Sequence, residues 1–151
     1  MSLEQEFELI RRVPIFSTTD PAMQKLLAFS SDRLTYEEGQ IMFSAGDPPD
    51  SAYIVMEGEV DITVPTPRGP LLVNTLRRND VIGEIGIFGD VPRTATAVAR
   101  TRVEALRISR DVFVNVIRSN PDAAIALVKI LADRLAKTTS QLRRMAAETS
   151  K

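Results

Sequence analysis

The chain has 151 residues, 44% of them hydrophobic, which is enough for one well-buried core but not for two full domains. Its 19 basic and 20 acidic residues leave a net charge of −1, so no overall field attracts nucleic acid or an anionic membrane. Cysteine and histidine are absent, which excludes disulfides, thiol nucleophiles, Ser-His-Asp triads and histidine-rich metal sites. We therefore expect a protein that is not an enzyme and that holds no metal or cofactor.

No apolar run approaches the roughly 20 residues needed to span a bilayer. The amino-terminal segment MSLEQE also lacks the basic start and the apolar stretch of a signal peptide. The sequence thus predicts a cytoplasmic chain with no membrane span and no direct binding of nucleic acid.

Two short helices are predicted at the amino terminus. Leu3, Phe7 and Ile10 recur at helical spacing, and Pro14 ends that pattern. Asp20-Pro21 then has the composition of an N-cap followed by a first helical residue. The apolar positions of this second helix, which we expect to face a core, are Met23, Leu26, Leu27 and Phe29.

Between Arg33 and Ser109 the sequence consists of short apolar runs separated by Gly, Pro, Asn and Asp. This pattern is typical of a β-sandwich or β-barrel. Residues 59–64 alternate strictly between polar and apolar, so one face of that strand should meet the core and the other water. The further predicted strands are 40–43, 52–56, 71–76, 94–99 and 103–108, with hairpin turns at 57–58 and 67–69.

The most informative segment is residues 82–96, IGEIGIFGDVPRTAT, which places a carboxylate and a guanidinium nine residues apart around one short helix. Gly83 permits a turn that a side chain would obstruct, and the helix start behind it offers unpaired N–H groups to an anion. Arg93 can donate two parallel hydrogen bonds to a phosphate, whereas an ionised Glu84 can only accept and therefore suits a hydroxyl such as that of a ribose. An anion together with a hydroxyl indicates a nucleotide.

Two helices are predicted at the carboxyl end. Ser109 is placed to cap the first, and Asn120-Pro121 separates it from a longer second helix. Residues of that last helix fall at alternating steps of three and four, the spacing of a coiled-coil seam, and so favour a homodimer. The seam positions are Val128, Leu131, Leu135, Thr138, Leu142 and Met145.

The segment 82–96 resembles the phosphate-binding cassette of the cyclic nucleotide-binding domain family, and residues 45–60 are similar to the barrel signature of that family. The resemblance covers roughly Phe7 to Arg134. It implies an α+β, mainly β fold: a β-roll (double-stranded β-helix, a jelly-roll-like barrel) flanked by N-terminal helices and two C-terminal helices. It implies a single domain over 1–151, with helices in 1–32, the barrel in 33–109, the cassette in 82–96 and helices in 110–151.

The resemblance also implies roles for cassette residues. Glu84 would accept the ribose 2′-hydroxyl and Arg93 would hold the cyclic phosphate of cAMP or cGMP. Thr94 could favour guanine, although threonine also occurs in cAMP binders, and cAMP is the weakly preferred ligand. The backbone groups completing the cradle would be those of Gly83, Ile85, Gly86 and Ala95.

Several interpretations stay open from the sequence. Arg93 could instead be structural and pair with Glu84 or Asp90. Arg134 could either stack on the purine or lie on a solvated helix face, and the rival contacts from the same helix are Thr138, Thr139 and Ser140. The favoured function is a sensor that couples ligand binding to movement of its last helix and drives an effector outside this chain. The alternative is a degenerate barrel that binds no nucleotide and serves as an interaction or dimerisation module.

Overall fold

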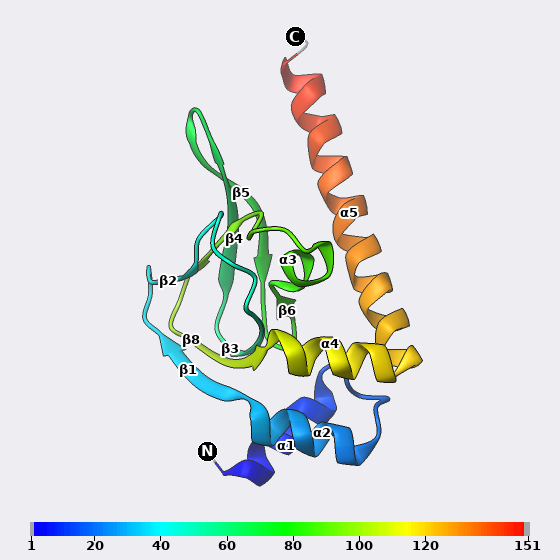
Figure 1. Ribbon diagram of the computed structural model, residues 1–151. Helices are drawn as coiled ribbons and strands as arrows, with labels where there is room; N and C mark the ends of the chain where they lie inside the picture. The colour runs from blue at the N-terminus through cyan, green and yellow to red at the C-terminus, as the bar shows by residue number, and fades with distance from the viewer. Residues whose placement is uncertain (1, 150–151) are drawn as a thin grey trace.

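A computed structural model of the chain describes residues 2–149 and contains, within them, five helices and eight strands (Figure 1). Met1 and residues 150–151, which the expected domain boundaries include, lie outside the described residues. The helices are α1 (Leu3–Arg12), α2 (Pro21–Ser30), α3 (Glu84–Gly89), α4 (Arg110–Ser119) and α5 (Pro121–Thr149). The strands are β1 (Asp32–Tyr36), β2 (Ile41–Phe43), β3 (Ser51–Glu57), β4 (Val60–Thr66), β5 (Gly69–Leu76), β6 (Val81–Ile82), β7 (Thr96–Ala99) and β8 (Val103–Ser109).

The strands form two antiparallel four-stranded sheets, with the orders β1-β8-β3-β6 and β2-β7-β4-β5. Helices α1, α2 and α4 gather at one end of the roll, and α5 rises past its side beyond α3 (Figure 1). This is the expected β-roll with helices at both ends of the chain. Among the described residues, no helix has both the length and the apolar character needed to cross a bilayer.

Strand β3 shows how the core is divided. It is buried along nearly its whole length because its alternate side chains enter two different apolar clusters. Ile54 and its neighbours on that face pack with the helices, whereas Tyr53 and Val55 point into the roll. The helices therefore cover the outer face of the first sheet, and the inner face is left to build the site.

The predicted helix boundaries rest on local caps that the structure contains. The Asp20 carboxylate accepts from the Ala22 N–H, with Pro21 at the first helical position, and the Ser109 hydroxyl accepts from the Val112 N–H. Asn120 ends α4, and Pro121 begins α5.

Two expectations about packing were wrong. Leu26 and Phe29 of α2 are exposed, and the buried positions beside Leu27 are Gln24 and Ala28, because the buried face of this helix is rotated from the purely apolar one. Gln24 can be buried because its amide donates to the Phe16 carbonyl.

The turn at 57–58 is also not a hairpin. Strand β3 pairs with β6 and β8, while β4 pairs with β5 and β7, so this turn carries the chain from one sheet to the other. The expected hairpin between β4 and β5 is present, with Thr66 opposite Gly69. The expected alternation in β4 is incomplete, since Val60 is buried but residues 61–64 are all half-buried.

Candidate functional site

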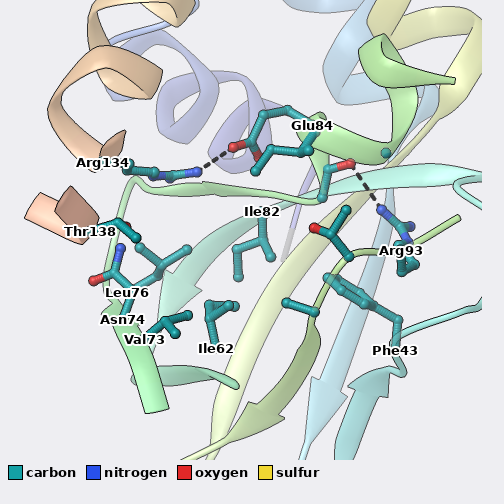
Figure 2. A pocket seen from close by; sticks show the side chains of 15 residues that line it. Phe43, Ile62, Val73, Asn74, Leu76, Ile82, Glu84, Arg93, Arg134 and Thr138 are labelled. Carbon is teal, nitrogen blue, oxygen red and sulfur yellow. Dashed lines mark hydrogen bonds and ion pairs between the residues drawn. The ribbon is translucent and has the colours of Figure 1, made fainter. Parts of the chain in front are cut away.

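The eight residues that the sequence singles out line one cavity of about 140 Å³ between the roll and α5 (Figure 2). Strand residues form the floor, the loop and helix 83–95 form one wall, and α5 closes the opposite side. The predicted residues in the lining are Gly83, Glu84, Ile85, Gly86, Arg93, Thr94, Ala95 and Arg134. Among them Ile85 and Thr94 are exposed, whereas Glu84, Gly86 and Arg93 are buried.

Two glycines allow the cassette wall to approach its neighbours. Gly83 has φ +92°, and a Cβ there would collide with the guanidinium of Arg93. At Gly86 a Cβ would lie 2.9 Å from the Cβ of Pro49. The cassette thus needs glycine at both positions to pack α3 against the roll.

Glu84 is the first residue of α3 and is 1% exposed. One carboxylate oxygen, Oε1, accepts from the Arg134 guanidinium, and the other, Oε2, is buried and has no hydrogen-bond partner among the described residues. Burial raises the pKa of this carboxyl above its ordinary value, and the positive charge of Arg134 opposes that shift. The site therefore presents one buried acceptor whose hydrogen bond remains to be made.

Arg93 is 4% exposed and is held by main-chain groups rather than by a close carboxylate. Its NH1 donates to the Gly83 carbonyl at 3.0 Å and its NH2 to the Ser51 carbonyl at 2.6 Å. The nearest carboxylate is that of Asp50, at 3.6 Å, while Nε is buried without a partner among the described residues. The alternative interpretation, in which Arg93 pairs with Glu84 or Asp90, is wrong, because those carboxylates pair with Arg134 and Arg110 instead.

Arg134 lies on α5 and points into the cavity toward Glu84 (Figure 2). Besides the ion pair, its NH2 donates to the Val81 carbonyl at 2.7 Å, and its side chain is only 19% exposed. The interpretation of this residue as part of a solvated face was therefore wrong. One turn further along, Thr138 also lines the cavity, whereas Thr139 and Ser140 are exposed.

Most of the other lining residues carry no signal that sequence reasoning could have used. Phe43, Ile62, Leu76 and Ile82 are ordinary apolar strand residues. Asn74 is a polar position inside β5, and its Oδ1 accepts from the Thr75 N–H at 2.9 Å. Only the irregular polar residue in an apolar strand could have drawn attention to it.

Comparison with known proteins agrees with this architecture. Residues 33–120 match the family model described as the cyclic nucleotide-binding domain. The chain belongs to this family.

Three individual proteins show how far the similarity extends. A "CRP-like cAMP-activated global transcriptional regulator" of Mycobacterium tuberculosis is 31% identical over 136 residues, 89% of this chain and 61% of that protein. The sensor domain of the transcriptional regulator DNR from Pseudomonas aeruginosa superimposes with a TM-score of 0.78 at 25% identity, covering 91% of this chain and 93% of that one. The regulatory subunit of a cAMP-independent protein kinase A from Trypanosoma cruzi, bound to guanosine, has a TM-score of 0.78 at 24% identity and covers 95% and 50% of the two chains.

The chain spans about 61% of the length of the mycobacterial regulator. The relatives are regulators and regulatory subunits, and this chain is a regulatory domain of the same family.

Proposed function

We propose that this domain binds a cyclic nucleotide, cAMP or cGMP, in the cavity between the roll and α5. The observation that carries the proposal is a pair of buried atoms, Arg93 Nε and Glu84 Oε2, that have no hydrogen-bond partner within residues 2–149 and belong to two lining residues of the same cavity. A buried donor and a buried acceptor left unsatisfied each cost roughly 1–3 kcal/mol. A ligand that supplies an anionic oxygen to one and a hydroxyl to the other would recover that free energy.

In this proposal Arg93 binds the cyclic phosphate and Glu84 accepts the 2′-hydroxyl of the ribose. The guanidinium suits the phosphate because its charge is permanent and its nearest carboxylate, that of Asp50 at 3.6 Å, is 81% exposed to solvent. Backbone groups of Gly83, Ile85, Gly86 and Ala95 line the same wall and would complete the cradle. The base would then lie toward Thr94, Thr138 and Arg134.

The ligand would act on α5 through the contact between Arg134 and Glu84. A ligand hydroxyl at Glu84 shares its carboxylate with Arg134, so binding changes the contacts that hold the helix against the cavity. Ligand can shift the helix only by the difference in its affinity for the two helix positions. The effector that responds would lie outside these 151 residues, and the whole chain would serve as one sensor domain.

A homodimer through α5 is a second part of the proposal. Val128, Leu135 and Leu142 recur every seven residues along α5 and are all more than half exposed. Such a stripe is stabilised when a second copy covers it. Sedimentation at several concentrations tests this, and a monomer mass that does not change with concentration contradicts it.

Calorimetric titration of the folded protein with cAMP and cGMP, side by side, tests the binding proposal. We expect saturable binding of at least one of them to one site per chain. If neither binds at near-millimolar concentration, the domain is an interaction module instead. Guanosine belongs in the same series, because binding of the nucleoside with equal affinity would show that phosphate recognition is not the function of Arg93.

A further inference from the structure

An aromatic stack lies directly behind the guanidinium of Arg93. The guanidinium carbon is 4.2 Å from the centre of the Phe43 ring, and the Phe43 ring stacks on that of Tyr53 with centroids 5.8 Å apart and an interplanar angle of 29°. Tyr53 is buried on the inner face of β3. The three planar groups thus form one column that begins at the cavity and ends inside the roll.

Phe43 reaches this place because the pairing of β2 with β7 is irregular. Ile41 pairs with Val98 and Phe43 with Ala97, so the register shifts between them. Met42 and Phe43 are consecutive and yet both join the inner cluster, which a regular strand would not allow. The irregularity therefore directs the ring of Phe43 toward the guanidinium.

Hydrogen bonds alone leave the orientation of this guanidinium incomplete. The carbonyls of Gly83 and Ser51 accept from NH1 and NH2, and the Asp50 carboxylate lies 3.6 Å from NH2. These contacts hold only the two terminal nitrogens, so the plane can still tilt about the line that joins them. The face of an aromatic ring attracts a cation and packs flat against it, which opposes that tilt. In the described part of the chain Nε is the guanidinium nitrogen without a partner, so a ring that limits the tilt also limits where this N–H points.

We propose that Phe43 is a positioning residue for anion recognition: its ring holds Arg93 so that the free N–H of the guanidinium faces the phosphate. The inference rests on the proposed function and adds a residue that contacts the phosphate only through Arg93. It predicts that loss of the ring weakens ligands with a phosphate selectively.

The test compares Phe43→Leu with the wild type against two ligands, the cyclic nucleotide that binds and its nucleoside, adenosine or guanosine. We expect the affinity for the cyclic nucleotide to fall about thirtyfold, the size of a desolvated cation–π contact. The affinity for the nucleoside, which enters the cavity that Phe43 lines, should fall by a much smaller factor. Phe43→Tyr retains the ring and should restore the affinity for the cyclic nucleotide. Equal losses for both ligands, or no loss for either, would overturn the inference.

Ile62→Ala is the matched control, because Ile62 lines the same cavity and joins the same cluster but belongs to β4. It should change the affinities for cyclic nucleotide and nucleoside by the same factor.

If the nucleoside binds too weakly to measure, the denaturation midpoints of Phe43→Leu, Arg93→Lys and the double variant test whether the ring and the guanidinium interact. A combined shift smaller than the sum supports the contact, and additive shifts contradict it. If the wild type binds no cyclic nucleotide, the proposed function is wrong as well. If the wild type binds it and Phe43→Leu binds it equally well, only this inference is wrong.

Discussion

The two arginines that line the cavity, Arg93 and Arg134, are held in different ways. Arg93, on the roll, is held by two carbonyls and an aromatic ring and is almost fully buried. Arg134, on α5, is held by the Glu84 carboxylate and the Val81 carbonyl and is partly exposed. A cation fixed by the backbone is prepared for a ligand before the ligand arrives. In the proposed function, Arg134 is instead coupled to the ligand, because the carboxylate that holds it is the one that would contact the ligand. The contrast would then separate recognition from response.

The same contrast divides α5 along its length. Ala123 and Leu127 are buried in the cluster formed by the helices and the outer face of the first sheet. Val128, Leu135 and Leu142 are exposed, and beyond that cluster Arg134 and Thr138 reach the cavity. The helix therefore has an anchored beginning and a later part whose described contacts with the cavity are few.

The largest effect on ligand binding is expected from removing the guanidinium of Arg93. Arg93→Ala should cost about 2–5 kcal/mol of binding free energy, the range for truncating one partner of a desolvated charge pair. Arg93→Lys retains the charge without the planar fork and should recover only part of that loss. Calorimetry measures both, with circular dichroism to show that the fold persists. An Arg93→Ala variant that binds cyclic nucleotide with wild-type affinity would contradict the assigned role.

The anchored beginning of α5 can be compared with its exposed part. Leu127→Ala should lower the free energy of unfolding by about 2–5 kcal/mol because it leaves a cavity in the core. Leu135→Ala, the same substitution two turns later, should change it by less than about 0.5 kcal/mol in the monomer. Urea denaturation at low protein concentration measures both. Similar losses in the two variants would mean that the later part of α5 is packed as tightly as its start.

Local signals explain which parts of the fold were predictable. Asp20-Pro21, Ser109 and Pro121 act within a few residues of themselves, so the sequence predicts the helix starts correctly. The turn at 57–58 has the composition of a hairpin, but the partners of β3 and β4 lie far along the chain. Which strands pair is decided by contacts that a local pattern does not contain.

The site divides in the same way. Glu84 and Arg93 belong to one continuous motif, and the structure brings both to the cavity, although their contacts with a ligand stay a prediction. Arg134 is 50 residues from Glu84, and nothing in its own segment separates a cavity-facing arginine from a solvated one. Phe43 is an ordinary strand residue by type, and only the irregular pairing of β2 turns it toward Arg93.

Breaking the ion pair between Arg134 and Glu84 should have an intermediate, pH-dependent effect on the free energy of unfolding. Arg134→Ala leaves the buried carboxylate of Glu84 without its cation and should lower stability by about 1–3 kcal/mol at neutral pH. Burial already raises the pKa of Glu84, and losing Arg134 raises it further. Because that folded-state pKa lies above the unfolded one, the variant loses stability as pH rises through it and regains stability as pH falls.

Unfolding of Arg134→Ala and wild type at neutral and mildly acidic pH measures this difference. Lys137→Ala, an exposed change on the same helix, serves as the control and should be nearly neutral at both pH values. The double variant Glu84→Gln/Arg134→Ala is compared with Glu84→Gln. The difference in their free energies of unfolding should be the same at both pH values. A destabilisation by Arg134→Ala that is the same at both pH values would show that Glu84 does not carry the charge.

The smallest expected effect concerns Tyr36, a half-buried residue of the edge strand β1. Burial, and next the neighbouring hydroxyl of Tyr53, raise the pKa of Tyr36 to about 12. Since the neutral phenol is favoured in the folded state, Tyr36 contributes stability that is complete below its ordinary pKa of 10 and is lost between there and about 12. The chain has two tyrosines and no tryptophan, so ultraviolet absorbance during an alkaline titration follows these phenols alone. Tyr53→Phe should lower the pKa of Tyr36, and Arg107→Gln should raise it by removing a positive charge. A pKa of Tyr36 that is the same in Tyr53→Phe as in the wild type would contradict the influence of the Tyr53 hydroxyl.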